Sequence, residues 1–139
     1  MPAFGTETIL LVDDEEFVRD LGARILAKAG YKVLIAANGK DALDLFEKER
    51  AKISLVILDL IMPEMGGEEC LKKLMNVDPH LKVLIASGLY ADLSTKEPVD
   101  MGARGFVTKP FRMKDLLVQV REVLDESRAG RSATLLKED

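Results

Sequence analysis

Five polar side chains follow short apolar runs of the sequence, at positions where strands are expected to end. They are three carboxylates, a hydroxyl and an ammonium: Asp13, Asp14, Asp59, Ser87 and Lys109. Three carboxylates that meet at one edge of a sheet repel one another unless a cation lies between them. A set of oxygen ligands without His or Cys favours a hard cation, and Mg²⁺ completed by waters and a phosphoryl oxygen fits it. Lys109 and Ser87 add a cation and a hydrogen-bond donor for an anionic group, which predicts a phosphoryl group on Asp59.

Each of these residues also has an ordinary structural role. An acidic pair such as Asp13-Asp14 often begins a helix or a turn. The pairs at Ser87 and Lys109 are common in loops, and a single lysine is usually solvated. Chance does not place all of them at successive strand ends, so their joint placement favours a functional site.

The elements that must position these residues are strands and helices in alternation. Five apolar runs rich in leucine or β-branched residues cover residues 9–12, 33–35, 53–58, 81–86 and 105–107. Most of the runs do not alternate with polar residues, which is typical of strands covered on both faces. The pattern predicts an α/β fold, a (βα)5 doubly wound sheet of parallel strands. Ligands of such sheets bind at the carboxyl ends of the strands.

Apolar side chains at helical spacing predict a helix after each of these runs. Gly30 supplies a stop for the first helix, Asn38 an N-cap for the second, and the third ends before Pro79. The last helix is expected over about residues 113–127. The fourth is expected to be short or irregular, because it contains Pro98 and an interior proline costs a helix about 3 kcal/mol.

Length and composition exclude several classes of protein. The chain has 139 residues, enough for one domain. A net charge of −4 gives no basic excess, so no direct contact with nucleic acid is expected. The sequence contains no long uncharged apolar stretch, which argues against a membrane span. Its one cysteine, Cys70, excludes an internal disulfide, and residues 1–8 do not resemble a secretory leader. We therefore expect a cytoplasmic location.

Four motifs, in this order, resemble the receiver domain of two-component response regulators, the chemotaxis-regulator-like family. They are LLVDDEE at 10–16, VILDLIMPEMGG at 56–67, IASG at 85–88 and FVTKPF at 106–111. The resemblance covers residues 7–127 and implies a flavodoxin-like sheet with strand order 2-1-3-4-5. Residues 128–139 have lost the apolar period and are expected to form a C-terminal tail or linker stub.

The resemblance implies a metal-dependent phosphoryl acceptor. Asp59 would take the phosphoryl group from a phosphohistidine of a sensor histidine kinase or a phosphotransfer protein. Asp14, Asp59 and the backbone carbonyl of Ile61 would bind Mg²⁺, with Mn²⁺ as a substitute, and Asp13 would act through a water. The domain would catalyse only its own Mg²⁺-dependent phosphorylation and dephosphorylation. Ile61 and Leu89 are apolar and cannot orient the hydrolytic water, which predicts slow autodephosphorylation.

The resemblance also implies a conformational switch. Ser87 and Lys109 would bind the phosphoryl oxygens, and the peptide bond to Pro110 would be cis. The ring of Phe106 would turn in response, although a static aromatic on a terminal strand is the alternative. The switch would alter the face of the fourth helix, fifth strand and fifth helix. An output partner, a fused domain or a second copy would dock there, and Pro98 leaves the geometry of such a dimer open.

A phosphorylated receiver has two possible forms, and three other functions stay open beside it. The chain could be a stand-alone regulator or the receiver of a hybrid histidine kinase, since GTET at residues 5–8 resembles the junction before such receivers. A flavodoxin-like electron carrier or an aspartate-based phosphatase would use a similar sheet. The acidic first loop lacks a phosphate cradle, and no second carboxylate stands two residues after Asp59, which disfavours both. A receiver that binds partners without phosphorylation is disfavoured because all five site residues are present.

Overall fold

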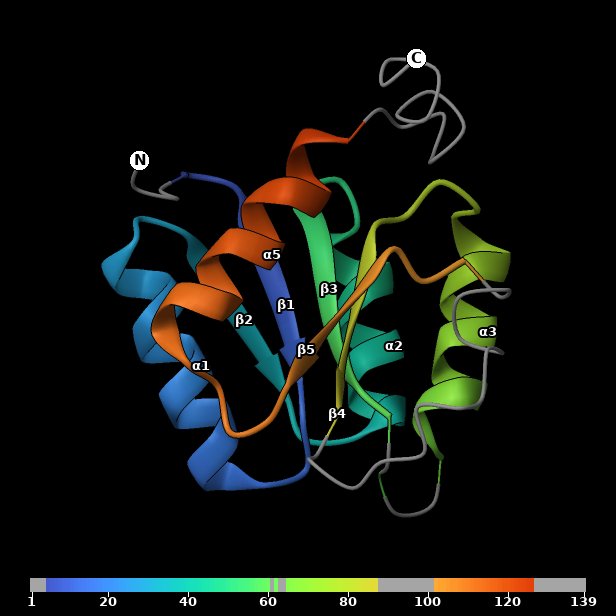
Figure 1. The fold of residues 1–139 in the computed structure, drawn as a ribbon. Coiled ribbons are helices and arrows are strands. Elements are labelled where there is room, and N and C mark those ends of the chain that lie inside the picture. Colours follow the sequence, from blue (N-terminus) through green and yellow to red (C-terminus); the bar gives the residue numbers. More distant parts are fainter. Residues whose placement is uncertain (1–4, 61, 63–64, 88–101, 127–139) are drawn as a thin grey trace.

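A parallel five-stranded sheet forms the centre of the computed structural model, which describes residues 5–60, 62, 65–87 and 102–126 (Figure 1). The strands are β1 (Thr8–Val12), β2 (Lys32–Ala36), β3 (Ile53–Asp59), β4 (Val83–Ser87) and β5 (Gly105–Thr108). Their order is β2-β1-β3-β4-β5, and every neighbouring pair is parallel. The predicted α/β class, the parallel sheet and the order 2-1-3-4-5 are confirmed.

Helices cover both faces of the sheet. In the described part of the chain they are α1 (Glu16–Lys28), α2 (Gly39–Glu49), α3 (Gly67–Val77) and α5 (Met113–Asp125). Figure 1 shows α1 and α5 on one face and α2 and α3 on the other. In β1, Ile9 belongs to the core under α1 and α5, and the next residue, Leu10, belongs to the core under α2 and α3. Burial on both faces explains why the strand sequences do not alternate.

The predicted fourth helix around Pro98 and the tail at 128–139 lie outside the described residues. None of the helices that the structure does describe is long and apolar enough to cross a membrane.

Two predicted helix boundaries are well placed. The side chain of Asn38 accepts a hydrogen bond of 2.8 Å from the backbone N–H of Asp41, so it caps α2 as predicted. Gly30, after α1, has a φ of 104°, and a Cβ at this position would meet the backbone oxygen of Gly5. The glycine therefore serves both the left-handed stop and the close passage of the N-terminal segment.

Two other predicted boundaries were wrong. β4 begins at Val83 rather than at Leu81, because the backbone N–H of Leu81 still closes a turn on the carbonyl of Asp78, at 3.1 Å. α5 ends at Asp125 rather than near residue 127. There the ammonium of Lys82, just before β4, donates to the carbonyls of Leu124 and Glu126, at 2.6 and 2.7 Å, and satisfies the end of the helix.

Candidate metal and phosphoryl site

Three carboxylates meet at the carboxyl ends of two neighbouring strands. Asp13 directly follows β1, Asp14 is next to it, and Asp59 is the last residue of β3. One oxygen of each lies within 4.8 Å of the others. Asp13 and Asp59 are buried, with 1% and 2% of their surfaces exposed, whereas Asp14 is open to solvent. This is an oxygen-only ligand set with a side open to water, which suits a hard divalent cation that keeps part of its hydration shell.

Lys109 lies against the same carboxylates. Its ammonium nitrogen Nζ is 2.9 Å from Oδ2 of Asp13 and 3.2 Å from Oδ1 of Asp59. Burial opposes the charge of Lys109, but the hydrogen bond to Asp13 and the negative charges of Asp59 and Asp13 outweigh it and raise its pKa above the ordinary value. Lys109 is therefore an ammonium at neutral pH, held beside the carboxylates of Asp13 and Asp59.

Asp13 is fixed by hydrogen bonds on several sides. Its Oδ1 accepts from the backbone N–H of Glu15 at 2.9 Å, and its Oδ2 contacts Lys109. The guanidinium of Arg19 donates to its backbone carbonyl at 2.8 Å. Asp13 thus organises the turn before α1, as an ordinary acidic pair would, and also faces the site. These contacts are compatible with both interpretations of Asp13, a structural role in the turn and a role in the candidate site.

Glu15 is a contact that the sequence analysis missed. Its Oε1 lies 3.4 Å from Nζ of Lys109, and its side chain is 63% exposed. The signal was present in the sequence, because Glu15 belongs to the same DDEE run as Asp13 and Asp14.

Gly67 lets the start of α3 lie close to the end of β3. Its N–H donates to the carbonyl of Leu60 at 2.9 Å, and a Cβ here would collide with the backbone of Asp59 and Leu60. A Cβ on the preceding Gly66 would meet no heavy atom within 4 Å. Of this glycine pair, Gly67 is therefore the one that close packing requires.

The remaining predicted site residues differ in how far the structure describes them. Ser87 is the last residue of β4, and its backbone pairs with Thr108 of β5 at the same end of the sheet. The peptide bond between Lys109 and Pro110 is cis. Phe106 lies on β5 with 37% of its surface exposed and lines a groove between β5 and α5. Ile61 and Leu89 lie outside the described residues. The structure thus gathers the side chains of Asp13, Asp14, Asp59 and Lys109 and aligns the backbone of Ser87 with them.

Known proteins share this arrangement over most of the chain. The family model described as "Response regulator receiver domain" matches residues 9–121. Chemotaxis protein CheY of Thermotoga maritima is 33% identical, over 83% of this chain and 95% of its own length. The sensor kinase CckA of Brucella abortus is 37% identical over 88% of this chain, which spans only 13% of that kinase. A chain of the crystal structure of the CheX-CheY-BeF3-Mg complex from Borrelia burgdorferi superposes with a TM-score of 0.81 and 29% identity, covering 86% of this chain and 90% of its own.

Proposed function

The chain belongs to the response regulator receiver family of two-component systems, and on that premise we propose that Asp59 is the residue that receives the phosphoryl group. The donor is the phosphohistidine of a sensor histidine kinase or of a phosphotransfer protein. The observation that carries the proposal is the position of Asp59: buried at the end of β3, within 4.8 Å of two other carboxylates and 3.2 Å from the ammonium of Lys109. The carboxylate of Asp59 can act as the nucleophile, and the ammonium of Lys109 offsets part of the negative charge that the carboxylate and the incoming phosphoryl group bring together.

Asp14, Asp59 and the backbone carbonyl of Ile61 would hold the divalent cation, and Asp13 would contribute through a water. The support for this division lies in the contacts of Asp13, since both of its carboxylate oxygens already accept hydrogen bonds. Asp14 is open to solvent, and its carboxylate accepts no hydrogen bond from any other residue that the structure describes. When bound, Mg²⁺ would offset the charge of the phosphoryl oxygens. The related complex from Borrelia burgdorferi holds Mg²⁺, and Mn²⁺ prefers the same oxygen ligands.

The transfer itself needs little covalent chemistry from the protein. A carboxylate oxygen of Asp59 forms a bond to phosphorus, the bond from phosphorus to the donor imidazole breaks, and the imidazole takes up a proton from solvent. Asp59 then carries nearly two negative charges in place of one. Lys109, already beside Asp59, pairs with a phosphoryl oxygen, and the hydroxyl of Ser87 donates to another.

The groove between β5 and α5 is the surface that this change would reach. Lys109 directly follows β5, and Phe106 lies three residues before it, on the wall of the groove with Val118 and Gln119 of α5. A shift of Lys109 would move the end of β5 and alter the space around the Phe106 ring. An output partner, a fused domain or a second copy would dock on this face. A static Phe106 is the alternative, and ring mobility measured with and without phosphorylation separates the two.

The setting of the domain follows from its chemistry. We propose a cytoplasmic location, which a phosphohistidine donor and the single cysteine support, with residues 7–127 as the receiver. The matches to a protein of similar length and to a small part of a sensor kinase fit both a stand-alone regulator and the receiver of a hybrid kinase. In either setting it is a signalling domain rather than a conventional enzyme, whose only reactions are its own phosphorylation and dephosphorylation.

Incubation with acetyl phosphate and Mg²⁺, followed by intact-mass measurement, tests the proposal. We expect wild type to gain one phosphoryl mass, and Asp59→Asn or omission of Mg²⁺ to abolish the gain. Asp44→Asn is the matched control, since this carboxylate is 67% exposed on α2 and outside the site. An unmodified wild type, or a gain that survives in Asp59→Asn, refutes the assignment. The same assay followed in time tests the apolar neighbours of the site: a lifetime of minutes agrees with slow hydrolysis, and one of seconds contradicts it.

A further inference from the structure

The outer edge of β2 is an open strand edge. β2 is the first strand in the sheet order, so within the described residues it pairs with β1 on one side only. The N–H of Lys32 and the carbonyl of Ala36 bond to the β1 side. Because bonded residues alternate along a strand, the backbone groups of Val33 and Ile35 point to the open side.

The sequence of β2 does little to protect this edge. Exposed edges are normally blocked by charges, proline or a bulge, because they offer a template for another strand. In KVLIA the only charge is Lys32 at the start, and the strand has a regular register against β1. Ile35 is 49% exposed, one of the few large apolar side chains of the described residues with such exposure.

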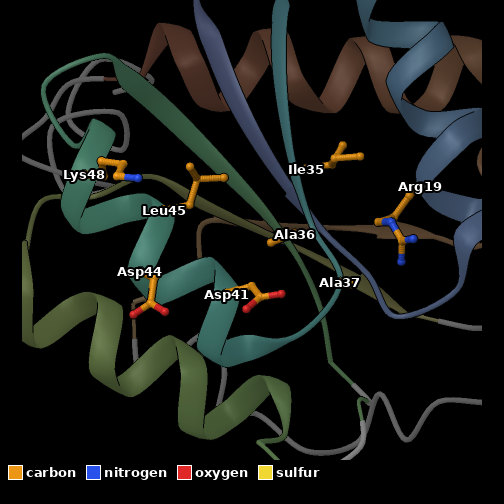
Figure 2. Close-up of a pocket in the computed structure, with 8 residues that line it drawn as sticks. All are labelled: Arg19, Ile35, Ala36, Ala37, Asp41, Asp44, Leu45 and Lys48. Carbon is orange, nitrogen blue, oxygen red and sulfur yellow. The ribbon is translucent and has the colours of Figure 1, made fainter.

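A groove of about 440 Å³ runs along this edge. Figure 2 shows that its lining comes from both faces of the sheet. Ile35 and Arg19 lie on the α1 side of β2, and Leu45 and Lys48 of α2 lie on the other side. An extended segment placed against β2 would therefore meet apolar side chains above and below, as an added strand in a sheet does.

The charges on the α2 side of the groove are arranged end to end, and the cation Arg19 lies apart from them on the α1 side. α2 returns antiparallel to β2, so Asp41 lies near the carboxyl end of the strand and Lys48 toward its start (Figure 2). Asp44 lies on the acidic side of this row, and Leu45 is at its middle. A row that reads acidic, apolar, basic is complementary to an inverted copy of itself. This is the pattern that a two-fold axis requires.

We propose that a second copy of this chain pairs antiparallel along β2, with the two-fold axis at Ile35. The two Ile35 residues then exchange backbone hydrogen bonds and cover each other's exposed side chain. Lys48 of each copy faces Asp44 of the other, and the two Leu45 side chains come together. β2 and β5 are opposite edges of the sheet, so this dimer leaves the groove beside Phe106 free for a partner.

Sedimentation velocity of the full chain, from micromolar to millimolar concentration, measures the proposed dimer. Ile35→Lys places two ammonium groups against each other at the axis and is expected to raise the dissociation constant by at least about tenfold. Val77→Lys is the matched control, because Val77 is a β-branched residue at the end of α3 with 36% exposure, and we expect it to leave dimerisation unchanged. Far-ultraviolet circular dichroism checks that both variants fold. Wild type that stays monomeric throughout overturns the proposal.

Two further measurements fix the face and the orientation. Val118→Lys perturbs α5 instead, and a dimer lost in this variant but kept in Ile35→Lys refutes pairing through β2. Asp44→Lys and Lys48→Glu should each weaken the dimer, and the double variant should restore it, because the inverted copy brings the exchanged charges together again. A double variant no better than the single ones contradicts the inverted arrangement. In wild type, amide exchange over residues 32–37 should slow as concentration rises, and exchange independent of concentration counts against the proposal.

Discussion

Replacing Asp14 with asparagine should stabilise the metal-free protein. One oxygen of Asp14 lies within 4.8 Å of an oxygen of Asp13 and of Asp59. At this distance two unit charges repel by about 0.9 kcal/mol in water and by about 3.5 kcal/mol at an effective dielectric constant of 20. Asp14 is exposed, so the lower value applies to each of its two interactions.

A second effect of the same substitution acts in the opposite direction. Asp14 stands just before α1, where a negative charge is worth about 0.5 kcal/mol against the helix dipole. The two repulsions exceed this contribution. We therefore expect Asp14→Asn to raise the free energy of unfolding without metal by about 1 kcal/mol.

Metal should reverse this difference. A ligand that binds only the folded state stabilises it in proportion to the logarithm of its concentration over its dissociation constant. Wild type should therefore gain stability as Mg²⁺ rises, and Asp14→Asn, which lacks one of the proposed ligands, should gain much less.

Urea unfolding with EDTA and with increasing Mg²⁺ measures both effects. Asp20→Asn is the control, since Asp20 is an exposed aspartate on α1 outside the carboxylate cluster. The reasoning is refuted if Asp14→Asn is less stable than wild type in EDTA, or if Mg²⁺ stabilises the two proteins equally.

Three further predictions concern stability and reactivity away from the metal. The hydrogen bond from Arg121 is the main cause that lowers the pKa of Glu7. The stabilisation from this pair is present above the pKa of Glu7 in the unfolded chain and is lost as the pH falls through its lower pKa in the folded protein. Urea unfolding should therefore show that Glu7→Gln lowers the free energy of unfolding by about 1 kcal/mol at pH 7 and leaves it unchanged at pH 2. Burial raises the pKa of the Cys70 thiol to about 11, so iodoacetamide at pH 8 should alkylate unfolded but not native protein, and rapid native labelling would contradict this. Gly67→Ala should cost about 1–3 kcal/mol and reduce phosphoryl uptake, whereas Gly66→Ala should do neither; equal effects would disprove the packing argument.

The strands and their order could be predicted because each follows from local chemistry. A run such as Ile9–Val12 is apolar at every position, and the structure buries it on both faces. The two wrong boundaries have different causes: β4 starts late because of a local turn at Asp78–Leu81, whereas the end of α5 depends on a long-range contact. α5 ends where the ammonium of Lys82 reaches its last carbonyls, from a residue far away in the sequence. No helical pattern within residues 113–127 contains that information.

The site could be predicted as a set of residue types but not as a set of contacts. The motifs placed Asp13, Asp59 and Lys109 at strand ends, and parallel topology then brought them together. What the motifs could not show is how each carboxylate oxygen is used. One carboxylate oxygen of Asp13 accepts a hydrogen bond in the turn before α1, and the other accepts one from Lys109. Glu15 is the third carboxylate that contacts this ammonium, after Asp13 and Asp59.

Under the proposed function, the charge balance of the site would let Lys109 serve both states of Asp59. Asp13, Asp14, Asp59 and Lys109 together carry three negative charges and one positive, a net −2 that a divalent cation would cancel, and the exposed Glu15 beside Lys109 adds one more negative charge. Transfer adds nearly one negative charge at Asp59. Lys109 is shared between Asp13 at 2.9 Å and Asp59 at 3.2 Å, so the charge added by the proposed transfer would shift its balance toward Asp59 without requiring a new cation. Since Lys109 directly follows β5, the proposed change of charge at the end of β3 would become a change of position at the end of β5.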